Sequence, residues 1–215
     1  MTIELDQILS RSAEFHRAYS RLLLGTKPYP TERVEASFCM CSLSQEHAEG
    51  LRALIARGHA NSATSLLRLQ YETLTRALWL LYCASDKVIE QLCQPLSAES
   101  EHAAKKLPGL NEMLGRLQAI ESAHHAYLKL IEFKSVSLNA LNSFVHGGIH
   151  PLKRHTEGFP VELAIEVVKN SNGLSHMTAV MMAMHTGDIT VITPVREIYS
   201  QYIDCLPPIV VTAAH

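Results

Sequence analysis

The sequence predicts an all-α fold of about seven helices, arranged as an antiparallel helical bundle. Nearly every strong periodicity of its apolar residues is helical. Only Asp188–Thr193 has the composition of a β-strand, and one short strand without partners does not make a sheet. Of the 215 residues, 47% are hydrophobic and 19% are charged, so the chain can bury a substantial core.

The N-terminal part predicts three helices. Ile3–Leu24 has a broad apolar face, and glycine and proline residues end it. Ser44 is the expected N-cap of a second helix over Gln45–Arg57. A third, strongly apolar helix over Ser62–Ser85 follows a short turn at Gly58–Asn61, so we expect the last two helices to form an antiparallel hairpin.

The middle of the chain predicts a short helix, a loop and two further helical segments. Asp86 is the expected cap of a helix that runs through Gln94. Leu96–Gly109 is the most polar stretch and predicts a solvated connection. Helical periodicity resumes over Leu110–Phe133 and again over Ser135–His146, after which two glycines end the helix.

The C-terminal part predicts two more helices. Pro160–Met184 is long and apolar, with an expected kink or break at Asn172-Gly173. Thr193-Pro194 is expected to open the last helix, which runs to about Cys205. We expect one domain over residues 1–215. Its parts are N-terminal helices (1–95, including the central helix 62–85), the polar connection (96–109), C-terminal helices (110–205) and a tail (206–215).

Composition narrows the possible functions. A net charge of −2 argues against a general binder of nucleic acids or anionic membranes. The five cysteines include no CxxC, no signal peptide is visible, and the longest apolar run, Ala77–Ala84, is too short to cross a bilayer. We therefore expect a cytoplasmic protein with reduced thiols. Nucleotide-binding, hydrolase and metal motifs are absent, so we expect no cofactor and no metal.

The most informative feature is a charged stripe on the apolar central helix. Arg68, Glu72, Arg76 and Trp79 recur at i, i+4, i+8 and i+11 and occupy a sector about 80° wide. One carboxylate cannot neutralise two guanidinium groups, so a buried stripe needs another acid, a histidine lone pair or an anionic ligand. The stripe is an ion-pair ladder, the wall of a ligand or catalytic site, or a subunit interface.

A second candidate is the polar face of Ser135–Gly148. Asn139, Asn142, Ser143 and His146 share this face, where a solvated helix would more often have lysine and glutamate. His146 falls in the last turn, where the helix dipole favours a cationic side chain. It is either a general acid or base, or a histidine that caps the helix.

Two other features have alternative interpretations. His47 lies on the apolar seam of its helix, so it is either a core histidine or a partner of Glu72 across the hairpin. The methionine-rich helix over Val161–Met184 is either core or the seam of a dimer.

The segments SLSQEHAEGLRALIARGHANSATSLLRLQYETLTRALWL and LNSFVHGGIHP resemble an uncharacterised family of bacterial all-helical proteins. That family is distantly similar to the HEPN (higher eukaryotes and prokaryotes nucleotide-binding) superfamily. The resemblance implies a helical bundle that dimerises, and a metal-independent ribonuclease of a toxin or antiphage system. HEPN nucleases have an arginine shortly before the catalytic histidine. None precedes His146 at that distance, so Arg68 or Arg76 would have to supply it from another helix.

Three functions follow as hypotheses. In a HEPN-like ribonuclease or RNA-binding protein, His146 is the general acid or base, Arg68 or Arg76 holds the phosphate, and Asn142 orients it. In a non-enzymatic binding module, a polar pocket holds a small anion or another chain. In an interaction scaffold, the methionine-rich helix forms a homodimer. The expected ligand contacts besides the catalytic residues are Glu72, Trp79, His47, Asn139 and Ser143.

Overall fold

The computed structural model describes residues 2–208 and confirms the all-α class. Within these residues there are ten α-helices, two short 3-10 helices and no strand, so the expected count of about seven helices was wrong. The helices are α1 (Ile3–Leu23), α2 (Glu32–Ala56), α3 (Ala60–Tyr82), α4 (Asp86–Cys93), α5 (Ala98–Ala104), α6 (Leu110–Gln118), η1 (Glu121–Ala123), α7 (His124–Val145), α8 (Ile149–Glu157), α9 (Val161–Thr186), α10 (Ile189–Gln201) and η2 (Ile203–Cys205).

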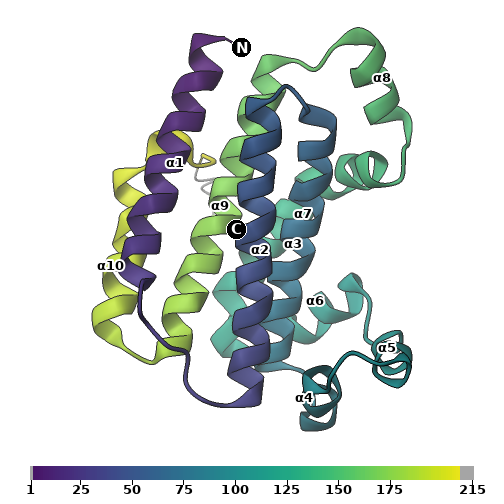
Figure 1. Ribbon diagram of the computed structural model, residues 1–215, viewed down its shortest axis with the longest axis vertical. Helices are drawn as coiled ribbons and strands as arrows, with labels where there is room; N and C mark the ends of the chain where they lie inside the picture. The colour runs from purple at the N-terminus through teal and green to yellow at the C-terminus, as the bar shows by residue number, and fades with distance from the viewer. Residues whose placement is uncertain (1, 209–215) are drawn as a thin grey trace, which may run out of the picture.

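The predicted hairpin is the centre of the molecule. Helices α2 and α3 run antiparallel and pack along most of their length (Figure 1). Helix α9 lies against both of them and, on its other side, against α1 and α10. Helices α6 and α7 pack on α3, whereas α4, α5 and α8 lie at the ends of the bundle (Figure 1). None of the described helices is both long and apolar enough to span a membrane.

Two apolar clusters meet at α9. The larger cluster fills the space among α2, α3, α6, α7 and α9 and includes Tyr71 and Trp79. The smaller cluster joins α1, α9 and α10 around Phe15, Tyr19 and Val195. Burial of these large side chains supplies the main stabilising free energy, at about 25 cal/mol per Å² of apolar surface.

A hydrogen-bonded polar seam crosses the core between α2, α3 and α9. Gln70 Nε2 donates to the Ser171 carbonyl (2.9 Å) and to Ser175 Oγ (3.2 Å), and Ser171 Oγ donates back to Gln70 Oε1 (2.7 Å). Gln45 Nε2 donates to the Ser175 carbonyl (2.9 Å) and Tyr19 Oη to Gln45 Oε1 (2.7 Å). These buried amide groups are thus satisfied, and they fix how α9 sits against the hairpin.

Two predicted helix starts in the N-terminal half were wrong. Helix α2 begins at Glu32 after the N-cap Thr31, and Ser44 lies buried inside the helix, where its Oγ donates to the Gln70 carbonyl (3.2 Å). Helix α4 exists as expected, but Asp86 is its first residue rather than its cap, and its carboxylate pairs with Arg33 (2.6 Å). In both cases the polar side chain bonds another helix instead of a local N–H.

The middle of the chain also differs from the expectation. The polar connection 96–109 contains helix α5. The periodicity over Leu110–Phe133 breaks between α6 and α7, and α7 then runs without interruption to Val145, so Phe133 and Ser135 belong to one helix. Helix α8 follows the two glycines, in a segment for which we expected no helix.

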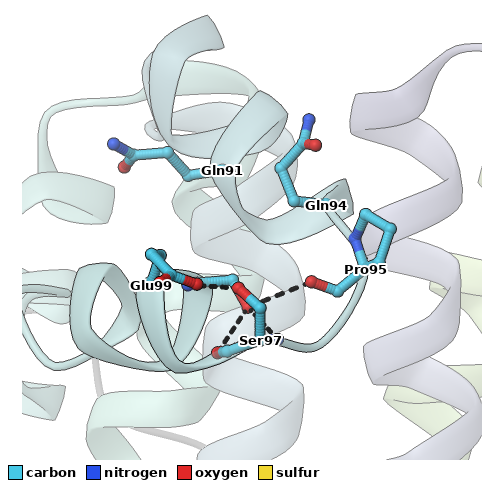
Figure 2. Close-up of a pocket in the computed structure, with 6 residues that line it drawn as sticks. Gln91, Gln94, Pro95, Ser97 and Glu99 are labelled. Carbon is cyan, nitrogen blue, oxygen red and sulfur yellow. Dashed lines mark hydrogen bonds between the residues drawn. The ribbon is translucent and has the colours of Figure 1, made fainter.

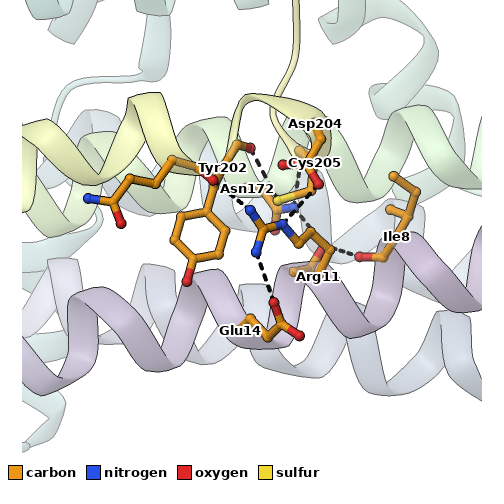
Figure 3. Close-up of polar contacts among 9 residues, drawn as sticks. Ile8, Arg11, Glu14, Asn172, Tyr202, Asp204 and Cys205 are labelled. Atoms are coloured by element: carbon orange, nitrogen blue, oxygen red, sulfur yellow. Dashed lines mark hydrogen bonds and ion pairs between the residues drawn. The ribbon is translucent and has the colours of Figure 1, made fainter.

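Helix α9 does not break at Asn172-Gly173. Asn172 Nδ2 donates to Ser12 Oγ (2.7 Å) and to the Cys205 carbonyl (2.8 Å), and a Cβ at Gly173 would lie only 2.8 Å from Pro207 Cγ (Figure 3). Asn172 therefore binds α1 and η2, and Gly173 leaves space for Pro207.

The segment that resembled a strand is the start of α10. Asp188 is its N-cap, with Oδ1 accepting from the Thr190 N–H (2.8 Å), so the helix begins before Thr193 and Pro194 lies inside it. Helix α10 ends near Gln201, and η2 follows. Of the predicted tail 206–215, Leu206 is buried, whereas 209–215 lie outside the described residues.

Arg11 of α1 holds the end of α10 and η2 in place (Figure 3). Its Nε pairs with Asp204 (2.9 Å), its Nη2 donates to the Gln201 carbonyl (2.6 Å), and its guanidinium lies 4.2 Å from the centre of the Tyr202 ring. Because these contacts are largely exposed, they position the end of α10 and η2 but contribute little to the free energy of unfolding.

Candidate functional site

The charged stripe of α3 (Arg68, Glu72, Arg76 and Trp79) reaches α7 through its first residue. Arg68 Nε donates to Asn142 Oδ1 of α7 (2.9 Å). Further along α3, Tyr71 Oη donates to the Leu130 carbonyl (3.0 Å). The structure therefore joins the two polar features that the sequence singled out, through a direct hydrogen bond between side chains 74 residues apart.

Only half of the expected ion-pair ladder forms. Arg68 Nη1 lies 2.7 Å from Glu72 Oε1, and the two side chains are 12% and 38% exposed. The N–H groups on Nη1 are not directed along this line, so the pair is an ionic contact rather than an aligned hydrogen bond. Arg76 makes no ion pair with any described acid, although Glu72 lies one turn away.

The stripe has unpartnered hydrogen-bond donors. Arg76 Nε and Trp79 Nε1 are both buried without a hydrogen-bond partner among the described residues. Trp79 is 1% exposed and belongs to the larger apolar cluster, so its ring is a core anchor rather than a stacking platform. Buried donors are normally satisfied, and because one of these two belongs to the uncompensated guanidinium of Arg76, the pair favours an acceptor with negative charge.

The polar face of α7 ends in an exposed corner where α7 meets α8. Asn139 and His146 are exposed, whereas Asn142 and Ser143 are half-buried. His146 is the C-cap residue of α7, and its N–H donates to the Asn142 carbonyl (3.1 Å). The imidazole therefore lies one turn beyond the Asn142 amide that Arg68 binds.

The corner is built by close packing of backbone on Ser143. Ser143 Oγ accepts from the His150 N–H (3.1 Å), and the Ser143 carbonyl accepts from the Gly148 N–H (2.8 Å). A Cβ at Gly148 would lie 2.5 Å from Ser143 Oγ, so an alanine at this position would have to displace the Ser143 hydroxyl. The exposed His150 ring stacks on Phe144, with 5.9 Å between ring centres.

His47 is not connected to this group. It is half-buried on α2, and burial lowers the pKa of its imidazole, an effect that Glu46 partly opposes. Among the described residues no hydrogen bond or ion pair joins it to Glu72. The structure thus brings together Arg68, Glu72 and Asn142 and leaves His47 apart.

The most perturbed histidine was not among the sequence candidates. His185 of α9 is buried, and its Nε2 lies 3.0 Å from Ser37 Oγ, which itself donates to the Ala77 carbonyl (2.8 Å). Nε2 therefore carries the proton, and Nδ1 is left without a partner. Burial lowers the pKa of His185 to about 4. Ser37 is fully buried, so the pair of His185 and Ser37 is structural, and no sequence motif indicates it.

Two cavities lie away from the stripe. One of about 430 Å³ lies between α4 and α5 (Figure 2) and is lined by Gln91, Gln94, Pro95, Ser97, Glu99 and Ser100. The other, of about 370 Å³, lies where α2 turns into α3. No group of three or more His, Cys, Asp or Glu side chains in residues 2–208 is arranged to hold a metal ion.

The fold and the stripe define an all-α bundle with a partly uncompensated cationic face on its central helix. The chain belongs to the family of unknown function DUF6988, whose model matches residues 41–208. The matched region contains the stripe, the α7 polar face and the corner at His146. No curated protein and no solved structure has significant similarity to the chain.

Proposed function

We propose that this protein is a non-enzymatic binding module that holds a small phosphate-bearing anion against the α3 stripe. The observation that carries the proposal is a pair of buried, unpartnered donors on α3: Trp79 Nε1 and the Nε of Arg76, whose guanidinium has no acid partner among the described residues. An anion would satisfy both the charge and the donors, whereas water would satisfy only the donors.

Arg68 has a different role in this proposal. Its Nε and Nη1 contact Asn142 and Glu72, so it links α7 to α3, and Arg76 is left as the arginine of the stripe that has no acid partner among the described residues. Arginine suits the ligand-binding position because its planar guanidinium donates two parallel hydrogen bonds to a phosphate.

The test is ligand-dependent stabilisation with inorganic phosphate as the probe. Phosphate should raise the melting temperature above that in chloride of equal ionic strength, by an amount equivalent to about 2.7 kcal/mol at a hundredfold excess over Kd. Arg76→Met should abolish the shift, and Arg76→Lys should weaken it. Arg116→Met removes an exposed arginine of α6 and is the matched control. An equal shift in all four proteins, or none in the wild type, would contradict the proposal.

A second candidate is a HEPN-like, metal-independent ribonuclease or RNA-binding protein of a toxin or antiphage system. It is favoured by the exposed imidazole of His146, one turn from the Asn142 amide that the stripe holds in place. Here His146 would accept or return a proton at the scissile phosphate. Arg76 lies two turns beyond Arg68 on α3, on the side away from His146, so it would bind another phosphate of the same RNA strand. Arg68 and Asn142 are engaged with each other, which assigns them to positioning.

Cleavage of labelled single-stranded RNA in the presence of EDTA tests this candidate. His146→Ala should abolish cleavage, whereas His125→Ala, an exposed histidine at the other end of α7, should leave it unchanged. If the wild type and both variants bind the RNA and none of them cleaves it, the nuclease hypothesis is rejected.

We also propose that the protein is cytoplasmic and forms a homodimer. Light scattering of the purified protein checks the dimer. The methionine side chains contribute little surface to the dimer, because Met181 is buried and Met177 and Met182 pack on the core. Only Met184 among them is exposed. A concentration-independent monomer would remove the dimer from the proposal.

A further inference from the structure

The second cavity has apolar walls and a single ionic group. It has a volume of about 370 Å³ and lies between the start of α1, the turn from α2 to α3, and the start of α9. Its lining residues are Leu5, Ile55, Ala56, Arg57, Gly58, Ala60, Phe159, Val161 and Ala164. Arg57 is the only charged side chain among them, and it is exposed at the rim. The volume lies in the range of pockets that bind small molecules.

The backbone around the cavity also favours negative charge. Helices α3 and α9 both begin at its wall, at Ala60 and Val161, and neither N-terminus has a side-chain cap. The C-terminus of α2 ends there too, but its last carbonyl groups accept from the N–H groups of Arg57 and Gly58. The two uncapped helix N-termini therefore place partial positive charge beside the cavity, which adds to the charge of Arg57, and the C-terminus of α2 offsets it in part.

Acidic groups close to the cavity do not neutralise it. Glu4 and Glu162 are next in sequence to Leu5 and Val161, but both are exposed and neither lines the cavity. Arg57 makes no ion pair with a described acid. The cation at the rim is therefore available to a ligand.

We infer that this cavity is a binding site for an acidic amphiphile, with the alkyl chain between Leu5, Ile55 and Phe159 and the carboxylate at Arg57. An apolar chain replaces water on walls that offer it few hydrogen bonds. The anion at the rim remains partly solvated while it contacts the guanidinium, so it avoids the desolvation cost of a fully buried charge. This site is separate from the α3 stripe and does not depend on the function proposed for it.

Calorimetric titration with decanoate below its micelle concentration tests the inference. Decanoate should bind saturably at one site, and the neutral decanol should bind about tenfold more weakly because it lacks the contact with the guanidinium. Arg57→Gln should lower decanoate affinity about tenfold, to that of decanol, whereas Arg57→Lys should retain most of it. Arg21→Gln, an exposed arginine at the far end of α1, is the matched control and should bind as the wild type does.

A second variant tests the place of the alkyl chain. Ala56 is an exposed lining residue, so Ala56→Trp fills the cavity from its rim without disturbing the core, and it should abolish binding of both probes. Absence of saturable decanoate binding to the wild type would overturn the inference. So would equal affinity for decanoate and decanol, or unchanged binding to Ala56→Trp.

Discussion

Buried His185 makes the stability of the fold depend on pH. Its pKa is about 4 in the folded protein and near its ordinary value of 6.5 in the unfolded chain. Between these values the unfolded state binds a proton that the folded state does not, so stability falls as the pH falls. The contribution is fully present above pH 6.5 and is lost towards pH 4. At 1.36 kcal/mol per unit, the loss amounts to about 3 kcal/mol.

Urea unfolding followed by Trp79 fluorescence at pH values between about 7 and about 4.5 measures this loss. The comparison is His185→Gln, whose amide can donate to Ser37 Oγ but does not titrate. Burial also lowers the pKa values of His16, His47 and His176, but these groups are common to both proteins. The wild type should therefore lose about 2–3 kcal/mol more than the variant by pH 4.5. Parallel stability curves would refute the reasoning.

Two further predictions concern the corner at Ser143 and Gly148 and the contact by which Arg68 braces α7 against α3. Gly148→Ala should destabilise the protein by about 1–2 kcal/mol in urea unfolding, because its Cβ would displace the Ser143 hydroxyl. Gly115→Ala, in a helix with open space around it, should be neutral or stabilise by up to about 1 kcal/mol. Arg68→Met should cost about 2–3 kcal/mol, because it leaves Asn142 Oδ1 half-buried without its charged donor. A cost for Arg68→Met below about 0.5 kcal/mol, as expected for an exposed pair, would contradict the role as a brace.

The parts of the fold that could be predicted from sequence are those with a continuous apolar pattern. The ends of helices α1 and α3 lie within three residues of their expected positions, because their faces are periodic and glycine or a short turn marks the ends. The contact between Arg68 and Asn142 was predicted only in part. The sequence placed both residues in one hypothetical site, but it indicated an acid, a histidine or an anion as the partner of the arginine, and in the structure the partner is the Asn142 amide.

Several of the errors share one physical cause, which is that a tertiary partner replaces a local one. Ser44 and Asn172 have the residue types of a cap and a break, but their hydrogen bonds go to other helices. Residues 189–193 are rich in β-branched side chains, but Asp188 caps them into a helix that packs on α9. Likewise, the sequence indicates that Arg76 and Glu72 are neighbours, but only the structure shows that Glu72 turns to Arg68.

The polar seam also constrains when the protein can fold during synthesis. The amides of Gln45 and Gln70 find their partners on α9, which follows them by 130 and 101 residues. A nascent chain that has released only α2 and α3 from the ribosome therefore has a hairpin whose inner surface is partly polar and unsatisfied. Such a hairpin gains little from early collapse, and contacts this distant in sequence form late. We expect premature termination before α9 to leave a product that chaperones and proteases recognise, rather than a smaller stable bundle.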